Sequence, residues 1–262
     1  MNILETIVAN KKLEVRSKKL EKTISDLEMA DLFQRKTLSL RKFLLDENRS
    51  GIIAEYKRKS PSKGIINNIS TVEDVTRSYA RSASGISVLT DADFFGGMNA
   101  DLMKARVNQI PILRKDFMID EYQIIEAKSI GADVILLIAA CLTVSEVKQF
   151  AGLAKRLGLE VLLEIHNEEE LGHICADIDF VGVNNRNLKT FEVDINTSLN
   201  LINKIPTEKL AITESGISKV DSIVTLKQAG FRGFLIGENF MKEPDPSIAF
   251  ADFVQQLKAK LG

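Results

Sequence analysis

Cysteine is scarce in this chain of 262 residues. The two cysteines, Cys141 and Cys175, lie far apart and outside any C-x-x-C spacing. The first residues, MNILETIVANKK, carry their lysines after a weak apolar segment, whereas a secretory signal carries its positive charge before the apolar segment. Both features predict a reduced, cytoplasmic protein.

Long apolar runs and an excess of one charge are also missing. The longest apolar run, from Val134 to Leu142, is too short for a transmembrane helix and is typical of a buried strand. With 45% apolar residues, 27% charged residues and a net charge of -1, the composition indicates a soluble globular protein. It argues against nucleic acid and membrane as partners, because a polyanion binder needs excess positive charge. It also favours a monomer.

Histidine is equally rare. His166 and His173 lie seven positions apart, with no ligand cluster or nucleophile motif around them. They therefore predict neither a metal site nor a catalytic triad. We expect His166 to be a surface residue or the start of a helix.

The chain length and an alternating pattern predict the fold. An α/β barrel has typically about 250 residues, so residues 1–262 are expected to form a single domain. Residues 1–48 show helical spacing and are expected to form an N-terminal helical extension that packs across one end of the barrel in residues 49–262. Strand-like runs separated by helical patterns occur at Ile52 to Lys57, Ile86 to Leu89, Ile110 to Arg114, Val134 to Ile138, Val161 to Ile165, Phe180 to Val183, Leu210 to Thr213 and Phe234 to Ile236. Eight such repeats predict a (β/α)8 TIM barrel; an open doubly wound sheet is less favoured, because no G-x-G-x-x-G follows the first strand.

Polar residues cluster where these runs end. In the first run, Glu55 and Lys57 alternate to one face of the strand, so an acid and a base project side by side. In a barrel the carboxyl ends of all strands meet at one mouth, which carries the functional residues. The other strand-end candidates are Lys115, Glu164, Asn184, Arg186 and Glu214. Convergence of these groups predicts acid and base groups with separate roles.

Each candidate also has a structural explanation. Glu55 and Lys57 can form an ion pair that fills a layer of the barrel, since buried charges are tolerated when paired. Glu164 can be supported by a salt bridge to Lys115, and Arg186 can be an exposed loop residue. We favour the functional interpretation because all of these charges are expected at one cavity.

Glycine and serine after the seventh and eighth strands predict an anion site. Ser215, Gly216, Gly237 and Glu238 follow these strands, where barrels frequently bind phosphate through backbone N–H groups. Lys57 and Ser60 from the first strand-to-helix connection are expected nearby. Glu238 fits beside a phosphate only if its side chain turns away.

Several motifs resemble one enzyme family. They are I-A-E-Y-K-R-K-S-P-S, S-V-L-T-D-x-x-F-F-x-G, P-I-L-R-K-D-F, L-L-E-I-H-N, G-V-N-N-R-N-L, E-S-G-I and L-I-G-E. Together, and in this order over nearly the whole chain, they resemble indole-3-glycerol phosphate synthase of tryptophan biosynthesis. The resemblance implies ring closure of 1-(2-carboxyphenylamino)-1-deoxyribulose 5-phosphate to indole-3-glycerol phosphate, with loss of carbon dioxide and water and without metal or organic cofactor.

The resemblance also implies residue roles. Lys115 is expected to be the general acid at the ketone, and Glu164 the base or second acid in dehydration. Lys57 would serve the phosphate, the hydroxyls or the second proton step, Glu55 would orient the lysines, and Asn184 would hold the substrate. Residues expected to contact the anthranilate part are Phe95, Phe117, Leu136, Leu188 and Ile236 as an apolar slot, and Arg186 at the carboxylate.

Two positions depart from the family pattern, and two other interpretations stay open. Met98 follows Gly97 where serine is usual, and Glu238 stands where a small or hydroxyl residue is often found. The alternatives are another phosphate-binding barrel, such as a phosphoribosyl isomerase, and a catalytically silent barrel. The first is disfavoured because the first strand ends without a cysteine, and the second because Lys115 and Glu164 are both present.

Overall fold

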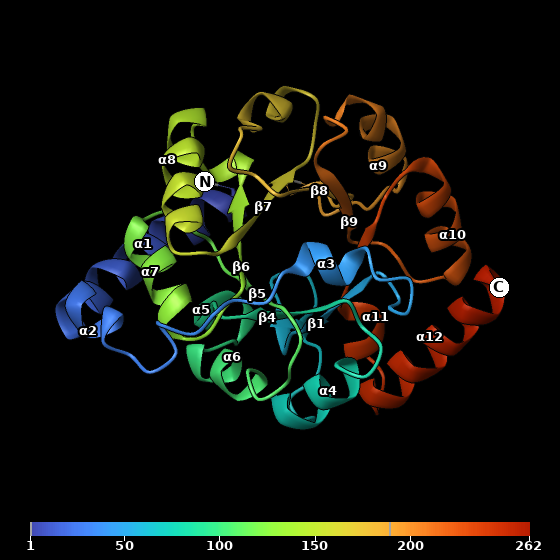
Figure 1. The fold of residues 1–262 in the computed structure, drawn as a ribbon, viewed down its shortest axis with the longest axis horizontal. Coiled ribbons are helices and arrows are strands. Elements are labelled where there is room, and N and C mark those ends of the chain that lie inside the picture. The colour runs from blue at the N-terminus through green and yellow to red at the C-terminus, as the bar shows by residue number, and fades with distance from the viewer. Residues whose placement is uncertain (1, 189) are drawn as a thin grey trace.

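Eight parallel strands close into a barrel in the computed structural model, which describes residues 2–188 and 190–262 (Figure 1). The ring follows chain order, and the first strand closes it by pairing with the last strand on one side and with the next barrel strand on the other. The strands are β1 (Ile52–Tyr56), β4 (Gly85–Leu89), β5 (Ile112–Lys115), β6 (Val134–Ile138), β7 (Glu160–Ile165), β8 (Phe180–Asn184), β9 (Leu210–Glu214) and β10 (Gly233–Ile236). The predicted (β/α)8 barrel is confirmed.

Helices surround the barrel, as the alternating pattern predicts. They are α4 (Val72–Tyr79), α5 (Ala92–Phe95), α6 (Asn99–Ala105), α7 (Glu121–Ser129), η1 (Ala139–Cys141), α8 (Val144–Arg156), α9 (Asn196–Leu201), η3 (Ile202–Lys204), α10 (Val220–Ala229), α11 (Glu238–Met241) and α12 (Pro246–Leu261). Among the described residues, no helix combines the length and apolarity that crossing a lipid bilayer requires.

Three segments differ from the sequence-based expectation. The segment after β7 is 3-10 helix, η2 (Glu169–His173), where a helical pattern was expected; it contains Gly172, which lowers helix propensity. β5 begins at Ile112, two residues later than predicted, because Pro111 has no N–H for the sheet. The connection after β1 forms a small hairpin from β2 (Lys59–Ser60) and β3 (Gly64–Ile65).

Alternation along the strands separates two apolar layers. In β1, Ile53 faces the barrel interior, whereas Ala54 and Tyr56 belong to the layer between strands and outer helices. The interior is filled by branched and aromatic side chains, which include Leu113, Leu136, Leu162, Phe180, Ile212 and Leu235. The barrel is therefore a packed core beneath its mouth.

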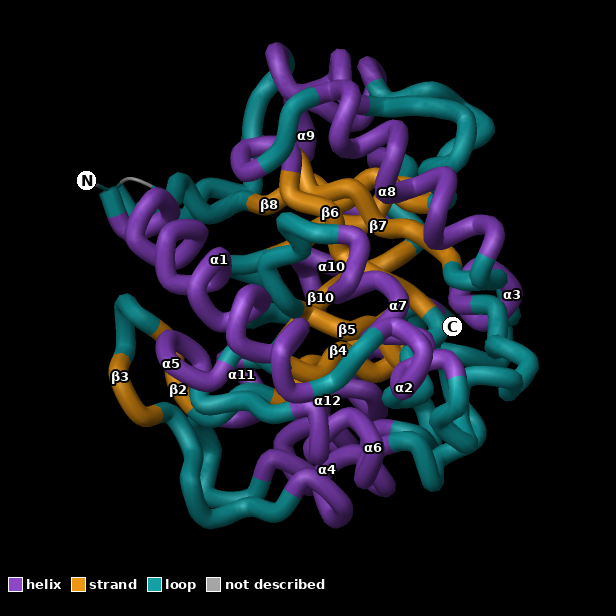
Figure 2. The backbone as a smooth tube through the Cα atoms, turned by 90° about the vertical axis from the view of Figure 1, so that its left-hand side faces the viewer, coloured by secondary structure: helices purple, strands orange, loops and turns teal. Residues whose placement is uncertain are grey.

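The N-terminal extension contacts both ends of the barrel, whereas the sequence predicted packing across one end. It comprises α1 (Ile3–Glu21), α2 (Ile24–Glu28) and α3 (Leu40–Leu44). Leu40 and Leu44 join the interior cluster from the amino-terminal end, and Figure 2 shows α3 on the opposite side of the barrel from the β2–β3 hairpin. The first turns of α1 reach the carboxyl ends, where Ile3 and Ile7 line a cavity.

Candidate active site

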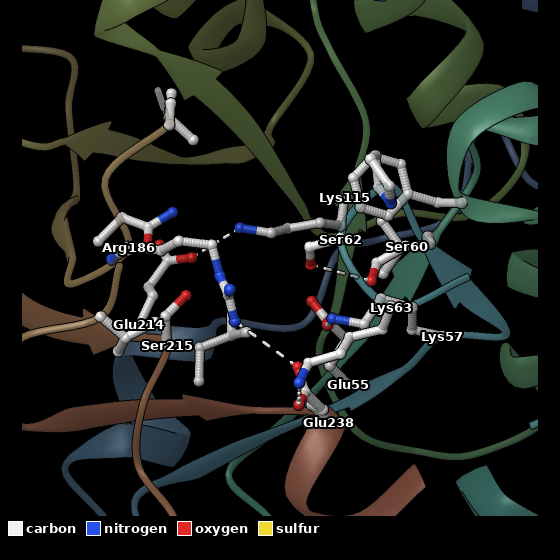
Figure 3. A pocket seen from close by; sticks show the side chains of 18 of the residues that line it. Glu55, Lys57, Ser60, Ser62, Lys63, Lys115, Arg186, Glu214, Ser215 and Glu238 are labelled. Carbon is white, nitrogen blue, oxygen red and sulfur yellow. Dashed lines mark hydrogen bonds and ion pairs between the residues drawn. The ribbon is translucent and has the colours of Figure 1, made fainter. Parts of the chain in front are cut away.

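A cavity of about 500 Å³ opens at the carboxyl ends of the strands. Figure 3 shows its charged side chains converging from different strands. The structure brings together every site residue selected from the sequence: Glu55, Lys57, Ser60, Phe95, Lys115, Phe117, Leu136, Glu164, Asn184, Arg186, Leu188, Glu214, Ser215, Gly216, Ile236, Gly237 and Glu238 all line this cavity. Residues far apart in the chain meet here because parallel strands end at one rim.

Lys115 lies between two carboxylates. Its Nζ is 2.9 Å from Glu164 Oε2 and 2.6 Å from Glu214 Oε2, and Figure 3 shows the ammonium directed towards Glu214. Burial alone would lower the pKa of Lys115, but Glu164, Glu214 and then Glu55 raise it above its ordinary value. Lys115 is therefore a protonated ammonium held in place from β7 and β9.

Glu164 has more polar contacts than Glu214. Its Oε1 accepts a hydrogen bond from Asn184 Nδ2 at 3.1 Å and lies 3.3 Å from His166 Nε2. Burial opposes ionisation, yet Lys115 and then His166 hold the pKa of Glu164 below its usual range. Glu164 is thus ionised, with three polar partners around it.

Glu214 has a different environment on the other side of Lys115. Its Oε1 is buried and has no hydrogen-bond partner among the described residues. Burial raises the pKa of Glu214 to about 7, against the opposing effect of Lys115. The two carboxylates therefore differ in proton affinity, with Glu214 binding a proton first, which is the arrangement that separates acid and base roles.

Glu55 and Lys57 project side by side, as their alternation predicts, and form the ion pair that was their structural explanation. Lys57 Nζ lies 2.8 Å from Glu55 Oε1, and both side chains line the cavity. Gly237 leaves the space that Glu55 occupies, since a Cβ there would lie 2.5 Å from Glu55 Oε1. Glu55 thus packs against the backbone of β10's end, and Lys57 still lines the cavity.

The connection after β9 has an unusual backbone. Ser215 has φ 68° and Gly216 has φ 75°, so two consecutive residues adopt the left-handed region. Ser215 is strained there, because left-handed conformations are uncommon for residues other than glycine. Gly216 is required, since a Cβ would lie 2.3 Å from Val193 Cγ1. Such turns can direct successive N–H groups towards an anion.

Glu238, at the start of α11, has two cations near its carboxylate. Its Oε2 lies 3.6 Å from Arg186 Nη2 and its Oε1 lies 3.9 Å from Lys63 Nζ. Figure 3 shows these three side chains together. Arg186 also donates from Nη1 to the carbonyl oxygen of Phe191 at 3.3 Å. Arg186 is therefore held at the cavity by neighbouring groups and is not a free loop arginine.

Apolar side chains form the remaining walls. The rings of Phe95 and Phe117 lie 6.0 Å apart, close enough for a favourable aromatic contact. Three residues of α1 that were not predicted from the sequence, Ile3, Leu4 and Ile7, line the cavity too. Their helical spacing predicts an apolar face on the helix, but it does not indicate which surface of the barrel that face covers.

His166 is not the surface or helix-start residue that the sequence suggested. Its side chain is only 11% exposed, and Nδ1 lies 3.2 Å from Glu170 Oε2 while Nε2 faces Glu164. The earlier expectation was wrong because Glu164 and His166 are two residues apart on one strand end and project to the same side.

Comparisons with known proteins identify the family of the chain. A family model described as indole-3-glycerol phosphate synthase matches residues 4–253. Indole-3-glycerol phosphate synthase of Bacteroides thetaiotaomicron is 46% identical over 259 residues, covering 98% of this chain and 99% of the relative. The enzyme of Caldanaerobacter subterraneus subsp. tengcongensis is 42% identical over 259 residues, with coverage of 98% and 99%.

A solved structure of a mutant tryptophan synthase alpha-subunit from Pyrococcus furiosus shares the fold. It has a TM-score of 0.62 and 16% identity, and the match covers 81% of this chain and 99% of that chain. At this identity the similarity supports the barrel architecture alone. The family follows from the full-length matches: the chain belongs to the indole-3-glycerol phosphate synthases, decarboxylating lyases of tryptophan biosynthesis that act on a small sugar phosphate.

Proposed function

We propose that the cavity closes the ring of 1-(2-carboxyphenylamino)-1-deoxyribulose 5-phosphate and releases indole-3-glycerol phosphate, carbon dioxide and water. The observation that carries the assignment of roles is the position of Lys115 between Glu164 and Glu214, at 2.9 and 2.6 Å. A small molecule in the cavity can therefore contact three groups: the ammonium of Lys115, the ionised carboxylate of Glu164 and the carboxyl group of Glu214, whose pKa is raised.

Lys115 is the general acid of the ring closure. The ring carbon that bears the carboxylate attacks the ketone carbon, and the ketone oxygen takes a proton from Lys115 Nζ. The bond to the carboxylate then breaks, and its electron pair restores the aromatic ring as carbon dioxide leaves. The raised pKa of Lys115 supports this role because the donor is protonated when the substrate binds.

Glu164 acts in the dehydration. The new hydroxyl group leaves as water after it takes a proton from Lys57 Nζ, and a neighbouring carbon loses a proton to form the double bond of the indole. Glu164 accepts that carbon-bound proton, which its ionised state and its contact with Asn184 support. Lys57, held by Glu55, serves the hydroxyl or the phosphate end of the substrate.

The substrate lies between an apolar wall and two anion sites. Phe95 and Phe117 pack against the anthranilate ring, and Arg186 pairs with its carboxylate before decarboxylation, since a guanidinium matches carboxylate geometry. The left-handed backbone at Ser215 and Gly216, with Gly237, supports a phosphate site at the other end. Fixing both ends brings the reacting carbons together, which can contribute as much as the proton transfers.

The protein works as a monomer in the cytoplasm, with neither nucleic acid nor membrane as a partner. The support is the near-neutral net charge of -1. Light scattering after size exclusion tests the association state, and a mass twice that of the chain contradicts it.

The decisive test is a direct assay. Purified protein is incubated with the carboxyphenylamino-deoxyribulose phosphate in the presence of a chelator, and indole fluorescence is followed. Formation of indole-3-glycerol phosphate with one equivalent of carbon dioxide is expected. A substrate that stays unchanged contradicts the proposed reaction.

A further inference from the structure

A row of five ionisable side chains of alternating sign extends from the cavity wall into the protein behind Glu164. It runs from Glu170 through His166, Glu164 and Lys115 to Glu214, with neighbouring charged atoms 3.2, 3.3, 2.9 and 2.6 Å apart. Each cation in the row lies between two carboxylates. The mechanism above uses Lys115 and Glu164 and leaves His166 without a role.

We propose that His166 is a positioning residue that keeps Glu164 ionised and directed at the substrate. His166 acts from the side of Glu164 opposite Lys115 and is not among the residues that line the cavity. The proposal rests on the proton-accepting role proposed above for Glu164.

The local fold fixes the imidazole in place. His166 follows the end of β7, and its backbone N–H donates to Glu170 Oε2 at 2.7 Å. The same carboxylate oxygen lies 3.2 Å from His166 Nδ1, so Glu170 fixes both the backbone and the ring. Glu170 is itself held by Asn167, whose Nδ2 donates to Glu170 Oε1 at 3.1 Å. The ring therefore has one orientation, with Nε2 towards Glu164.

The balance of charge explains why a second cation is needed. Lys115 is shared between Glu164 and Glu214, and Glu55 adds a third negative group to its surroundings. Without His166, one ammonium would have to keep several buried carboxylates ionised, which is unfavourable at low local dielectric. With His166 charged, Glu164 has two cations and Glu214 has one, so the proton goes to Glu214.

Other elements around His166 do not replace its charge. Asn184 from β8 contributes a neutral amide to Glu164. Cys141 in η1 stays a thiol, since burial raises its pKa to about 12. Burial disfavours the imidazolium, but the close carboxylates of Glu164 and Glu170, 3.3 and 3.2 Å from its ring nitrogens, raise the pKa of His166 to about 10. His166 is thus charged over the pH range in which a neutral-pH enzyme works.

The experiment compares His166→Gln with wild type. Glutamine keeps a side-chain donor but no charge, and His173→Gln is the matched control, because His173 bonds only to the carbonyl oxygens of Glu170 and Leu142 in the described structure. The readouts are the pH dependence of kcat and the carboxyl ¹³C resonance of Glu164, titrated by NMR. Loss of a cation within about 4–6 Å raises a carboxyl pKa by roughly 1–3 units.

In His166→Gln we expect two pKa values to rise by at least about one unit: that of the acid limb in the pH profile of kcat, and that of Glu164 from the titration of its resonance. At pH values below the acid limb, kcat should be about tenfold lower than in wild type. The thermal midpoint should stay close to that of the control. An unchanged limb and an unchanged resonance overturn the proposal and leave His166 a packing residue.

A parallel Glu164→Gln variant separates this proposal from the function on which it rests. Wild-type turnover by Glu164→Gln overturns the catalytic role of Glu164. In that case the resonance still decides the inference about His166: a raised pKa of Glu164 in His166→Gln supports the contact, and an unchanged pKa overturns it. If Glu164→Gln is inactive and His166→Gln behaves as wild type, only the inference about His166 fails.

Discussion

Lys11 Nζ lies 2.9 Å from Asp116 Oδ1, so the first helix forms an ion pair with the residue that follows Lys115. Asp91, two residues after the end of β4, lies 2.9 Å from the same ammonium through its Oδ2. All three side chains are fully buried. We propose that the N-terminal extension and the barrel form one unit that folds together. The buried charges of this cluster come from both parts, and each needs its partner from the other part to stay buried.

Replacing Lys11 tests this unit. Lys11→Met removes the cation from buried Asp91 and leaves buried Asp116 with Arg114 alone, so the free energy of unfolding should fall by about 3–5 kcal/mol, measured by urea denaturation. Lys12→Met, at the exposed neighbouring position, is the control and should change it by less than about 0.5 kcal/mol. Separate transitions for the extension and the barrel would contradict a single unit.

Lys115→Met tests the general acid. Loss of the proton donor should reduce kcat by roughly 10²- to 10⁴-fold, whereas binding of inorganic phosphate should change little. Steady-state fluorescence of indole formation gives kcat, and calorimetry gives the phosphate affinity. Lys155→Met on α8, which removes an outer ion pair with Asp179, should keep full turnover. Turnover near wild type in Lys115→Met would rule out Lys115 as the acid.

Glu238→Ser tests the phosphate site. A carboxylate near a bound phosphate costs about 1 kcal/mol at 4 Å even in water, so its removal should strengthen phosphate binding about fivefold. Arg186 and Lys63 would also lose their present anionic partner and become available. Titration with inorganic phosphate measures the effect, and Glu243→Ser, further along the chain at an exposed position, is the control. Weaker binding in Glu238→Ser would show that the carboxylate supports the site.

Gly237→Ala tests the position of Glu55. The new methyl group would lie 2.5 Å from Glu55 Oε1 and 2.8 Å from its Cβ, so Glu55 and its partner Lys57 must move. We expect a drop in kcat/KM of at least about tenfold, since small displacements of catalytic groups are costly. Gly172→Ala is matched to it, because a Cβ at Gly172 meets nothing within 4 Å. Equal kcat/KM values for the two variants would refute the steric argument.

The pH dependence of stability reports on Glu214. Its pKa is raised from 4.5 to about 7, so the folded protein holds this proton more tightly than the unfolded chain does. This contribution to stability is complete below pH 4.5 and is lost as the pH rises to about 7. The stability of wild type relative to Glu214→Gln should therefore decline across this window in urea titrations. A constant difference from pH 4.5 to 7 would mean that Glu214 has an ordinary pKa.

Much of the site was predictable because strand periodicity is local. Glu55 and Lys57 are two residues apart, so their shared side of β1 follows from the sequence, as does the position of Lys115 at a strand end. The same rule applied to Glu164 predicts that His166 lies on the same side as Glu164, which is where the structure has it and not at the surface. The partners of Lys11 lie far along the chain, and a pairing at that distance follows only from the closed barrel.

Short elements were the least predictable. β2 and β3 have two residues each, too few for any periodicity to mark them as strands, although they pair locally as a hairpin. The sequence therefore indicated only a loop between β1 and α4. The difference in proton affinity between Glu164 and Glu214 was equally hidden, since it depends on which neighbours reach each carboxylate after folding.

Leu40 and Leu44 of α3 fill the amino-terminal end of the barrel beneath the packed interior. A Cβ at Gly85 would lie 2.7 Å from Leu40 Cδ1, so the strand backbone and this leucine are in close contact. Small molecules thus enter and leave at the carboxyl rim. The products, which are carbon dioxide, water and the phosphorylated indole, must leave past the same side chains of α1 and the β2–β3 hairpin that the substrate passes on entry. Substrate binding and product release therefore use the same opening.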